Sequence, residues 1–255
     1  QIFVLDVLKV IGDSRMRPYI GQGIPTYTIF STMGLFFMMM VIYLRNKIFD
    51  FLEYLEFIAI LAIGAGIGSK VLFIITQIPD IVEHFSLRYM CYKVVTSGFV
   101  FYGGLIGAIE GTILFAHIKQ LPKKEVLQLA TPGYSIFHAV GRIGCFFAGC
   151  CYGKVTSWGF ALWNEPGVKR IPVQLIESVY LFILTIILLK NENKWRDKIF
   201  EVYMVSYAMF RFVIEFFRGD SIRGIWGCFS TSQWIAILIV ILFLDREIKK
   251  WRKNI

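Results

Sequence analysis

The feature that most constrains this chain is a series of long apolar runs, each bounded by charged residues. A helix needs about 20 mostly apolar residues to cross the hydrocarbon core of a bilayer. Continuous apolar runs exclude a transmembrane β-barrel, whose strands alternate apolar and polar residues. The sequence therefore predicts an all-α polytopic membrane protein with seven transmembrane helices, at Ile24–Leu44, Tyr54–Ile78, Val94–His117, Val126–Cys151, Pro172–Leu189, Ile199–Phe217 and Gly227–Leu244.

The composition agrees with this class. Hydrophobic residues make up 56% of the chain and charged residues 18%, whereas soluble domains average roughly a quarter charged residues. Five cysteines in 255 residues are too few, and odd in number, for a disulfide scaffold. Because the connections between the apolar segments are short, we expect one integral membrane domain covering residues 1–255.

The distribution of Lys and Arg predicts the orientation, because these residues are enriched in cytoplasmic loops. The loops after the first, third and fifth segments, together with the tail Asp245–Ile255, hold 14 of them, against 10 on the opposite side. We therefore expect the N-terminus outside and the C-terminus in the cytoplasm. The net charge of +9 is then explained by the membrane surface, and no basic face for nucleic acid is visible.

Arg142 is the most informative ionisable residue, because charge at membrane depth is costly and marks functional candidates. It lies in a glycine-rich stretch with Gly141, Gly144, Gly149 and Gly153. Glycines allow a helix to break around a polar ligand, and a guanidinium beside such a break matches two phosphate oxygens. The alternative is a snorkelling or carboxylate-paired arginine near a helix end.

A second charged cluster closes the sixth segment. Arg211 and Glu215 are four residues apart and share a helix face, so we interpret them as an internal ion pair. Arg218 lies one turn further and is either an interface arginine or a second phosphate ligand. Two arginines beside a glycine-rich break suit a phospholipid headgroup better than either does alone.

Two further segments contribute candidates. Pro172 opens the fifth segment, and Gln174 and Glu177 are three residues apart on one face. A buried Glu177 needs a cation, which Arg142 or Arg218 can supply. In the third segment, Tyr102 precedes Gly103 and Gly104 and either faces a cavity or lies at an interface, while packing is a sufficient explanation for most of the glycines there.

The cysteines permit several interpretations. The predicted topology places all five at or near the outer side (Cys91, Cys145, Cys150, Cys151 and Cys228). The spacing Cys-x-x-x-x-Cys-Cys, without a second His/Cys pair, argues against a zinc site. Structural disulfides form if the outside is oxidising, and unreactive buried thiols are the common alternative. Among the histidines, His138 stands out because it lies one turn before Arg142.

Taken together, these motifs resemble the prolipoprotein diacylglyceryl transferase family over nearly the whole chain. The resemblance rests on their order, their spacing and the seven-span setting. The matching segments are Pro25-Thr-Tyr27, Gly68-Ser-Lys70, Ser97-Gly98 through Gly104, Gly141-Arg142-Ile-Gly144-x-Phe146 through Gly153, Pro172-x-Gln174-Leu-x-Glu177 and Arg211 through Asp220.

The resemblance implies a transferase of the bacterial cell membrane. Such enzymes move the diacylglyceryl group of phosphatidylglycerol onto the lipobox cysteine thiol of a prolipoprotein signal peptide, releasing glycerol phosphate, without a cofactor or metal. By this resemblance, Arg142 and Arg218 hold the phosphate and stabilise the leaving charge. Tyr102 departs from the family pattern, and we assign it an orienting role because a phenol is a poor base near neutral pH. The substrate-binding positions are Tyr27, Gly103, Gly104, Gly141, Gly144, Gln174, Glu177 and Glu215.

The chain departs from the family pattern at several polar positions. Cys145, Ala148 and Cys150 stand where the family usually has asparagines and a glutamate, and Tyr102 stands where it often has histidine. A related phospholipid-dependent transferase with a different acceptor is therefore the main alternative. A membrane thiol-redox protein is a further alternative, but this chain lacks the Cys-x-x-Cys motif that such proteins usually carry. A transporter needs inverted repeats or a charged pathway across the bilayer, and neither is visible.

Overall fold

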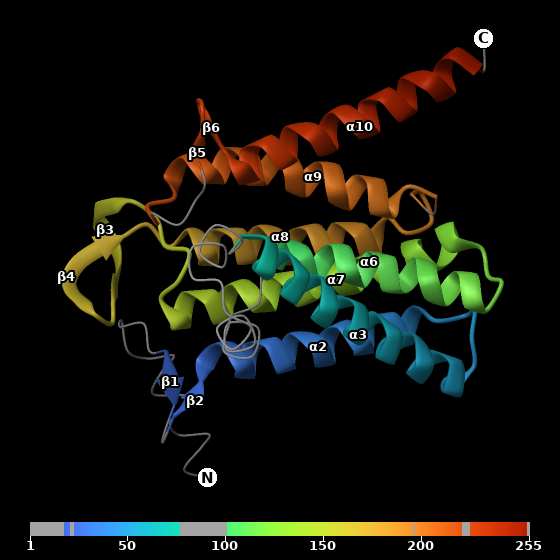
Figure 1. Cartoon of the computed structure of the whole chain (residues 1–255), viewed down its shortest axis with the longest axis horizontal. Helices are drawn as coiled ribbons and strands as arrows, with labels where there is room; N and C mark the ends of the chain where they lie inside the picture. The colour runs from blue at the N-terminus through green and yellow to red at the C-terminus, as the bar shows by residue number, and fades with distance from the viewer. Residues whose placement is uncertain (1–17, 21–22, 77–100, 196, 221–224, 254–255) are drawn as a thin grey trace, which may run out of the picture. The chain divides into compact units, whose positions relative to one another are not determined.

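The computed structural model describes residues 18–20, 23–76, 101–195, 197–220 and 225–253 (Figure 1). Seven α-helices lie within these residues, one in each predicted apolar segment. They are α2 (Thr26–Arg45), α3 (Phe51–Thr76), α6 (Phe101–Ile118), α7 (Lys123–Ala148), α8 (Val173–Lys190), α9 (Ile199–Ile214) and α10 (Thr231–Lys253).

Three of these helices, α2, α3 and α8, are long and apolar enough to cross a membrane. Residues Gly103–Ile118 of α6 form a shorter apolar helix. The first part of the predicted third span, residues 94–100, lies outside the described residues. The helical class is thus confirmed, while seven spans remain a prediction.

The sixth and seventh segments differ from their predicted bounds. Helix α9 stops at Ile214, and a short 3-10 helix, η1 (Glu215–Phe217), leads to Arg218 in an extended conformation. The start predicted at Gly227 is wrong, because α10 begins only at Thr231. The backbone N–H of Ser230 donates to Oε1 of Gln233 (2.9 Å), and that of Gln233 to Oγ of Ser230 (3.3 Å). This reciprocal capping box fixes the first turn of α10.

Short antiparallel strands, which the all-α prediction did not include, join several helices. Strands β3 (Val155–Leu162) and β4 (Glu165–Arg170) form a hairpin in the connection between α7 and α8. Gly159 in β3 has a φ of +106°, a value that favours glycine, and a Cβ there would overlap the carbonyl oxygen of Arg170. Two smaller pairs are β1 (Tyr19–Ile20) with β2 (Ile24–Pro25), and β5 (Ile225–Trp226) with β6 (Phe229–Ser230).

The described chain divides into two compact units. One contains the residues up to Val41 and those from Thr131 onward, and the other contains those between Ile42 and Ala130. In the second unit, α3 packs on α6 through glycines, because a Cβ at Gly64, Gly68, Gly103 or Gly107 would overlap backbone of the facing helix.

In the first unit, hydroxyl groups join α7 to α8. Ser178 donates to the carbonyl oxygen of Ala139 (2.7 Å), and Thr185 donates to Oγ of Ser135 (2.8 Å). Interhelical hydrogen bonds of this kind are a common means of joining helices in membranes. They bring the inward face of α8, with Gln174 and Glu177, against α7, so the two helices that carry Arg142 and Glu177 are fixed together.

Candidate functional site

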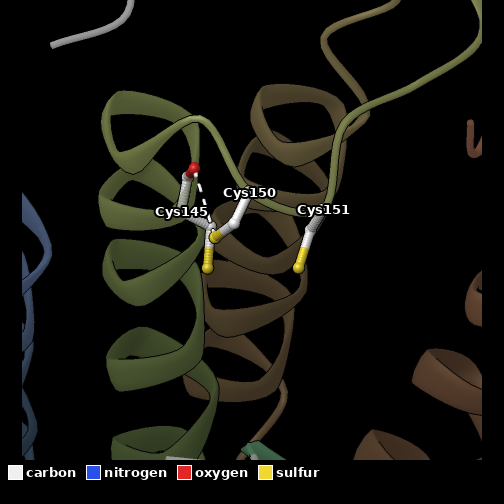
Figure 2. A group of neighbouring side chains, drawn as sticks. All are labelled: Cys145, Cys150 and Cys151. Carbon is white, nitrogen blue, oxygen red and sulfur yellow. Dashed lines mark hydrogen bonds between the residues drawn. The ribbon is translucent and has the colours of Figure 1, made fainter. Parts of the chain in front are cut away.

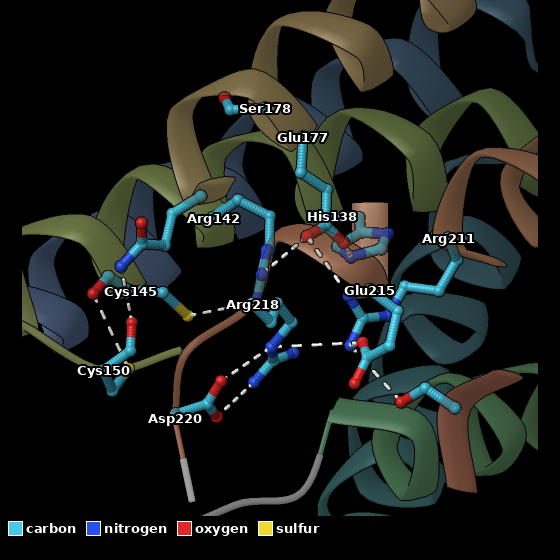
Figure 3. A network of polar contacts seen from close by, with 12 residues as sticks. His138, Arg142, Cys145, Cys150, Glu177, Ser178, Arg211, Glu215, Arg218 and Asp220 are labelled. Atoms are coloured by element: carbon cyan, nitrogen blue, oxygen red, sulfur yellow. Dashed lines mark hydrogen bonds and ion pairs between the residues drawn. The ribbon is translucent and has the colours of Figure 1, made fainter. Parts of the chain in front are cut away.

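A buried cluster of charged side chains lies in the first unit, where α7, α8 and α9 meet (Figure 3). Three guanidinium groups face three carboxylates, so the cluster is balanced in formal charge. Every member is at most 8% exposed: Arg142, Arg211, Arg218, Glu177, Glu215 and Asp220. The sequence placed these residues on three separate segments, and the fold brings them together.

Glu177, only 1% exposed, is the centre of this cluster. Its Oε2 lies 2.5 Å from Nη2 of Arg142 and 3.9 Å from Nη1 of Arg211. Its Oε1 accepts a hydrogen bond from the hydroxyl of Tyr207 (2.7 Å) and lies 3.6 Å from Nε2 of His138. The prediction that a buried Glu177 takes a cation is confirmed, and Arg142 is the nearer of the two arginines that pair with it.

Arg211 and Glu215 form the ion pair that their four-residue spacing predicted. Nη2 of Arg211 lies 2.7 Å from Oε2 of Glu215. The same nitrogen donates to Oγ of Ser232 at the start of α10 (3.3 Å). Arg211 therefore links the end of α9 to Glu177 on one side and to α10 on the other.

Arg218 is held by Asp220 in a two-point contact. Its Nε donates to Oδ1 (2.9 Å) and its Nη2 to Oδ2 (2.5 Å), while Glu215 Oε2 lies 4.0 Å from Nε. Burial lowers the pKa of Arg218, but the hydrogen bonding to Asp220 and the neighbouring Cys151 outweigh it and raise the pKa above its ordinary value. The guanidinium is thus permanently charged, and a ligand anion must share or replace its carboxylate partner.

The backbone ties the Arg218 segment to the end of the α7 segment. Gly153 forms an isolated antiparallel bridge with Arg218. The N–H of Lys154 donates to the carbonyl oxygen of Phe217 (2.9 Å), and that of Gly219 to Tyr152 (3.0 Å). A Cβ at Gly153 would overlap the carbonyl oxygen of Ile171, so glycine is required for this close approach.

Arg142 keeps donor capacity beyond its ion pair. Its Nε is buried and has no hydrogen-bond acceptor within the described part of the chain. Its Nη1 lies 3.8 Å from Sγ of Cys145. A Cβ at Gly141 would meet nothing within 4 Å, whereas one at Gly144 would lie 3.0 Å from Phe30 and 3.3 Å from the ring of Tyr27. Gly144 thus packs on α2 at Tyr27, and the space beside Gly141 is open.

Gln174 is fully buried and anchors the segment that follows α7. Its Nε2 donates to the carbonyl oxygen of Cys150 (2.7 Å). Gly149 has a φ of +71°, and the N–H of Cys150 donates to the carbonyl oxygen of Cys145 (3.2 Å). The predicted glycine break is therefore a tight reversal at the end of α7, in the form common for helix C-termini.

The remaining predicted site residues lie in the second unit. Gly103 packs against Gly68, and Gly104 lies near Ala65 and Ser69, in agreement with the packing interpretation. Tyr102 lies in the first turn of α6, but its side chain is outside the described part of the structure. A substrate role for these three residues stays a prediction.

Tyr207 was missed by sequence reasoning, although a signal exists. Tyr203, Tyr207 and Arg211 are spaced four apart, so they share one face of α9. The hydroxyl of Tyr203 lies 3.5 Å from Nδ1 of His138 and that of Tyr207 contacts Glu177. Ser232 carried no signal, because its contact depends only on how α10 packs against α9.

The described cysteines are free thiols: Cys145, Cys150, Cys151 and Cys228. Cys91, the fifth one, lies outside the described residues. Of the fates that the sequence left open, a disulfide is therefore not formed among these four. Three of them converge beside Arg142, as described below.

The chain is similar to one family of known proteins over most of its length. Residues 19–244 match the family described as "Prolipoprotein diacylglyceryl transferase". The chain is 37% identical over 191 residues to phosphatidylglycerol–prolipoprotein diacylglyceryl transferase 2 of Clostridium perfringens, covering 71% of this chain and 73% of that protein. It is 34% identical to the Clostridium tetani enzyme of that name (71% and 74% covered) and 29% identical to the Geobacter sulfurreducens one (76% and 77% covered).

Proposed function

The chain belongs to the prolipoprotein diacylglyceryl transferase family, and we propose that it transfers the diacylglyceryl group of phosphatidylglycerol to the lipobox cysteine of prolipoproteins. In this reaction the cysteine thiolate attacks the glycerol carbon that bears the phosphate ester. The carbon–oxygen bond breaks, a thioether forms, and glycerol phosphate leaves. The thiol proton passes to a base or to water, because the thiolate is the effective nucleophile.

The observation that supports this proposal best is the state of Arg142. It is buried and positioned by Glu177, yet its Nε has no acceptor within the described residues. A buried donor without a partner costs about 1–3 kcal/mol, so the site is suited to a ligand that supplies an oxygen. The non-bridging oxygens of a phosphodiester meet this need.

Arg218 is the proposed second phosphate ligand. Its planar fork is already engaged by the carboxylate of Asp220 in the geometry that a phosphate adopts. Bound phosphate would take over part of this contact, and the charge that develops on the leaving group would strengthen it. Differential stabilisation of this kind lowers the barrier to the transfer.

The proposed setting is a multi-pass protein of the bacterial cell membrane, with seven spans, the N-terminus outside and the C-terminus inside. Phosphatidylglycerol then reaches the site from the surrounding lipid, and the signal peptide of the prolipoprotein from the outer side. A reporter fused after Ile255 should be active only in the cytoplasm. Activity of a reporter that needs an oxidising exterior would overturn the orientation.

A reconstituted assay tests the reaction. Purified protein is incubated with labelled phosphatidylglycerol and a lipobox peptide, and both products are measured. Lipidated peptide with an equal amount of glycerol phosphate is the expected result. Release of glycerol phosphate without lipidated peptide would favour a different acceptor, and thiol oxidation without lipid transfer would favour a redox protein.

Substitution of Arg142 makes this test specific. Arg142→Lys keeps the charge but loses the forked geometry, so the rate should fall at least about tenfold, equivalent to roughly 1.5–3 kcal/mol for a charged hydrogen bond. Arg170→Lys is the matched control, because Arg170 pairs with Glu165 on the hairpin. Near-normal transfer by Arg142→Lys at equal expression would show that Arg142 has a structural role and does not bind the phosphate.

A further inference from the structure

Three cysteine side chains converge at the end of α7. Cys145 lies in the last turn of the helix, and Cys150 and Cys151 follow it after the reversal. Their three Sγ atoms all lie within 4.8 Å of one another. In Figure 2 the three thiols point to the same side of the segment.

The backbone conformation and its contacts fix the positions of these three cysteines. Cys151 has a φ of +57°, in the left-handed region that residues other than glycine rarely adopt. Such conformations persist where the surrounding structure enforces them and are concentrated at functional sites. Here Gln174 holds the carbonyl of Cys150, and the bridge between Gly153 and Arg218 holds the chain that follows.

The cluster is compact enough to hold a metal ion, although the sequence spacing by itself argued against a zinc site. Zinc binds thiolates at about 2.3 Å, so tetrahedral geometry places sulfur atoms about 3.8 Å apart. The observed spread of up to 4.8 Å therefore requires only about 1 Å of closure.

A guanidinium group lies beside the cluster. Nη1 of Arg142 lies 3.8 Å from Sγ of Cys145. Three thiolates with one divalent cation would carry one net negative charge, and a positive charge at this distance stabilises it.

We propose that Cys145, Cys150 and Cys151 bind a Zn²⁺ ion whose fourth coordination position takes the thiol of the acceptor cysteine. This inference rests on the proposed function and adds the step that activates the nucleophile. Zinc sites with three protein ligands keep a fourth position open for water or substrate. A thiol that coordinates zinc is deprotonated outright.

The chemistry then balances without a redox step. The acceptor thiol displaces water from Zn²⁺ and releases its proton to solvent. The coordinated sulfur attacks the glycerol carbon, the carbon–oxygen bond breaks, and the electron pair leaves with glycerol phosphate between Arg142 and Arg218. The thioether product, a neutral and weaker ligand, leaves the metal. This role would account for Cys145 and Cys150, which stand where the family usually has asparagine or glutamate side chains.

Metal binding is tested directly on the reduced full-length protein in detergent. Equilibrium dialysis with Zn²⁺ should show one ion per chain, and Co²⁺ should give the sulfur-to-metal absorption of three thiolates. Cys145→Ser, Cys150→Ser and Cys151→Ser should each weaken Zn²⁺ binding by at least about 100-fold. Cys228→Ser is the matched control and should bind normally, because Cys228 is an exposed thiol outside the cluster.

The open position is tested with peptides and the Co²⁺ form. A lipobox peptide should add a fourth sulfur to the absorption spectrum, and the same peptide with serine in place of cysteine should not. An unchanged spectrum with both peptides, absent metal binding, or unchanged binding in the three serine variants would each overturn the inference. If zinc binds and the thiol coordinates but no lipid is transferred, the proposed function fails while the metal site stands.

Discussion

Two regions of this molecule join their helices in opposite ways. Helices α3 and α6 approach through glycines, with backbone against backbone, and Lys119, directly after α6, pairs with Glu53 and Glu56 of α3. Helices α7, α8 and α9 instead meet around Glu177, which contacts two arginines, a histidine and a tyrosine. The first arrangement gains dispersion energy from close approach, and the second depends on charges that must all be present.

The difference indicates where function is to be sought. Close packing is a sufficient explanation for Gly64, Gly68, Gly103 and Gly107, because the facing backbone leaves no room for a Cβ at these positions. A buried ionic cluster is weak evidence for stability, since apolar packing would often do as well. In the proposed function, its arginines supply the fixed positive charge that holds a lipid phosphate.

The largest expected effect comes from removing the centre of the polar region. Glu177→Ala leaves Arg142 and Arg211 without their shared carboxylate. Breaking a buried ion pair on one side typically costs about 3–5 kcal/mol, so we expect a large loss of thermal stability together with loss of transfer. Thermal unfolding in detergent measures it, and Glu165→Ala on the exposed hairpin is the control. Equal stability of both variants would contradict the central role of Glu177.

The glycine seam should give the next largest effect, and on stability alone. A Cβ at Gly107 would overlap the carbonyl oxygen of Gly64, so Gly107→Ala should push α3 and α6 apart at a cost of about 1–3 kcal/mol. Gly66→Ala, in the same helix pair, meets nothing within 4 Å and should be neutral or slightly stabilising. If the two variants unfold at the same temperature, the close-packing account is wrong.

A smaller effect is expected from one hydrogen bond in the polar region. Tyr207→Phe removes the donor to Glu177 at 2.7 Å and keeps the ring. We expect a loss of about 1–2 kcal/mol, because the acceptor is charged and the bond joins two helices. Tyr203→Phe, whose hydroxyl lies 3.5 Å from His138, is the matched control and should lose less. The melting temperatures of the two variants, measured side by side, test whether Tyr207→Phe loses more stability than Tyr203→Phe.

The smallest expected effect concerns Tyr102, which begins α6. A phenol has an ordinary pKa of about 10 and is a poor base near neutral pH, so we assign it an orienting hydrogen bond. Tyr102→Phe should lower the transfer rate by a modest factor, and Tyr102→His should retain activity. A fully active Phe variant beside an inactive His variant would identify Tyr102 as a packing residue.

Much of this architecture could be predicted from the sequence, because the relevant signals are local. Apolar runs predicted seven helices, and the four-residue spacing of Arg211 and Glu215 predicted their ion pair. The hairpin β3–β4 was missed, since a short strand pair depends on its turn and on the close approach at Gly159. The start of α10 was misplaced because the capping box at Ser230 and Gln233 lies after apolar residues that count toward the run.

The partners within the site were harder to predict than its members. Arg142, Glu177 and Arg218 were identified as charges in apolar surroundings, which is a property of the sequence alone. Which cation Glu177 takes follows from the meeting of α7 and α8, which are separate segments of the sequence. Asp220 is close to Arg218 in the sequence, and its two-point contact depends on the extended conformation that follows η1. Only the tertiary structure decided that Cys145, Cys150 and Cys151 share one small volume, because the chain reversal after α7 is set by long-range contacts to Gln174 and Arg218. Hydrophobicity acts on each segment by itself, whereas pairing of buried polar groups depends on which segments the packing brings together.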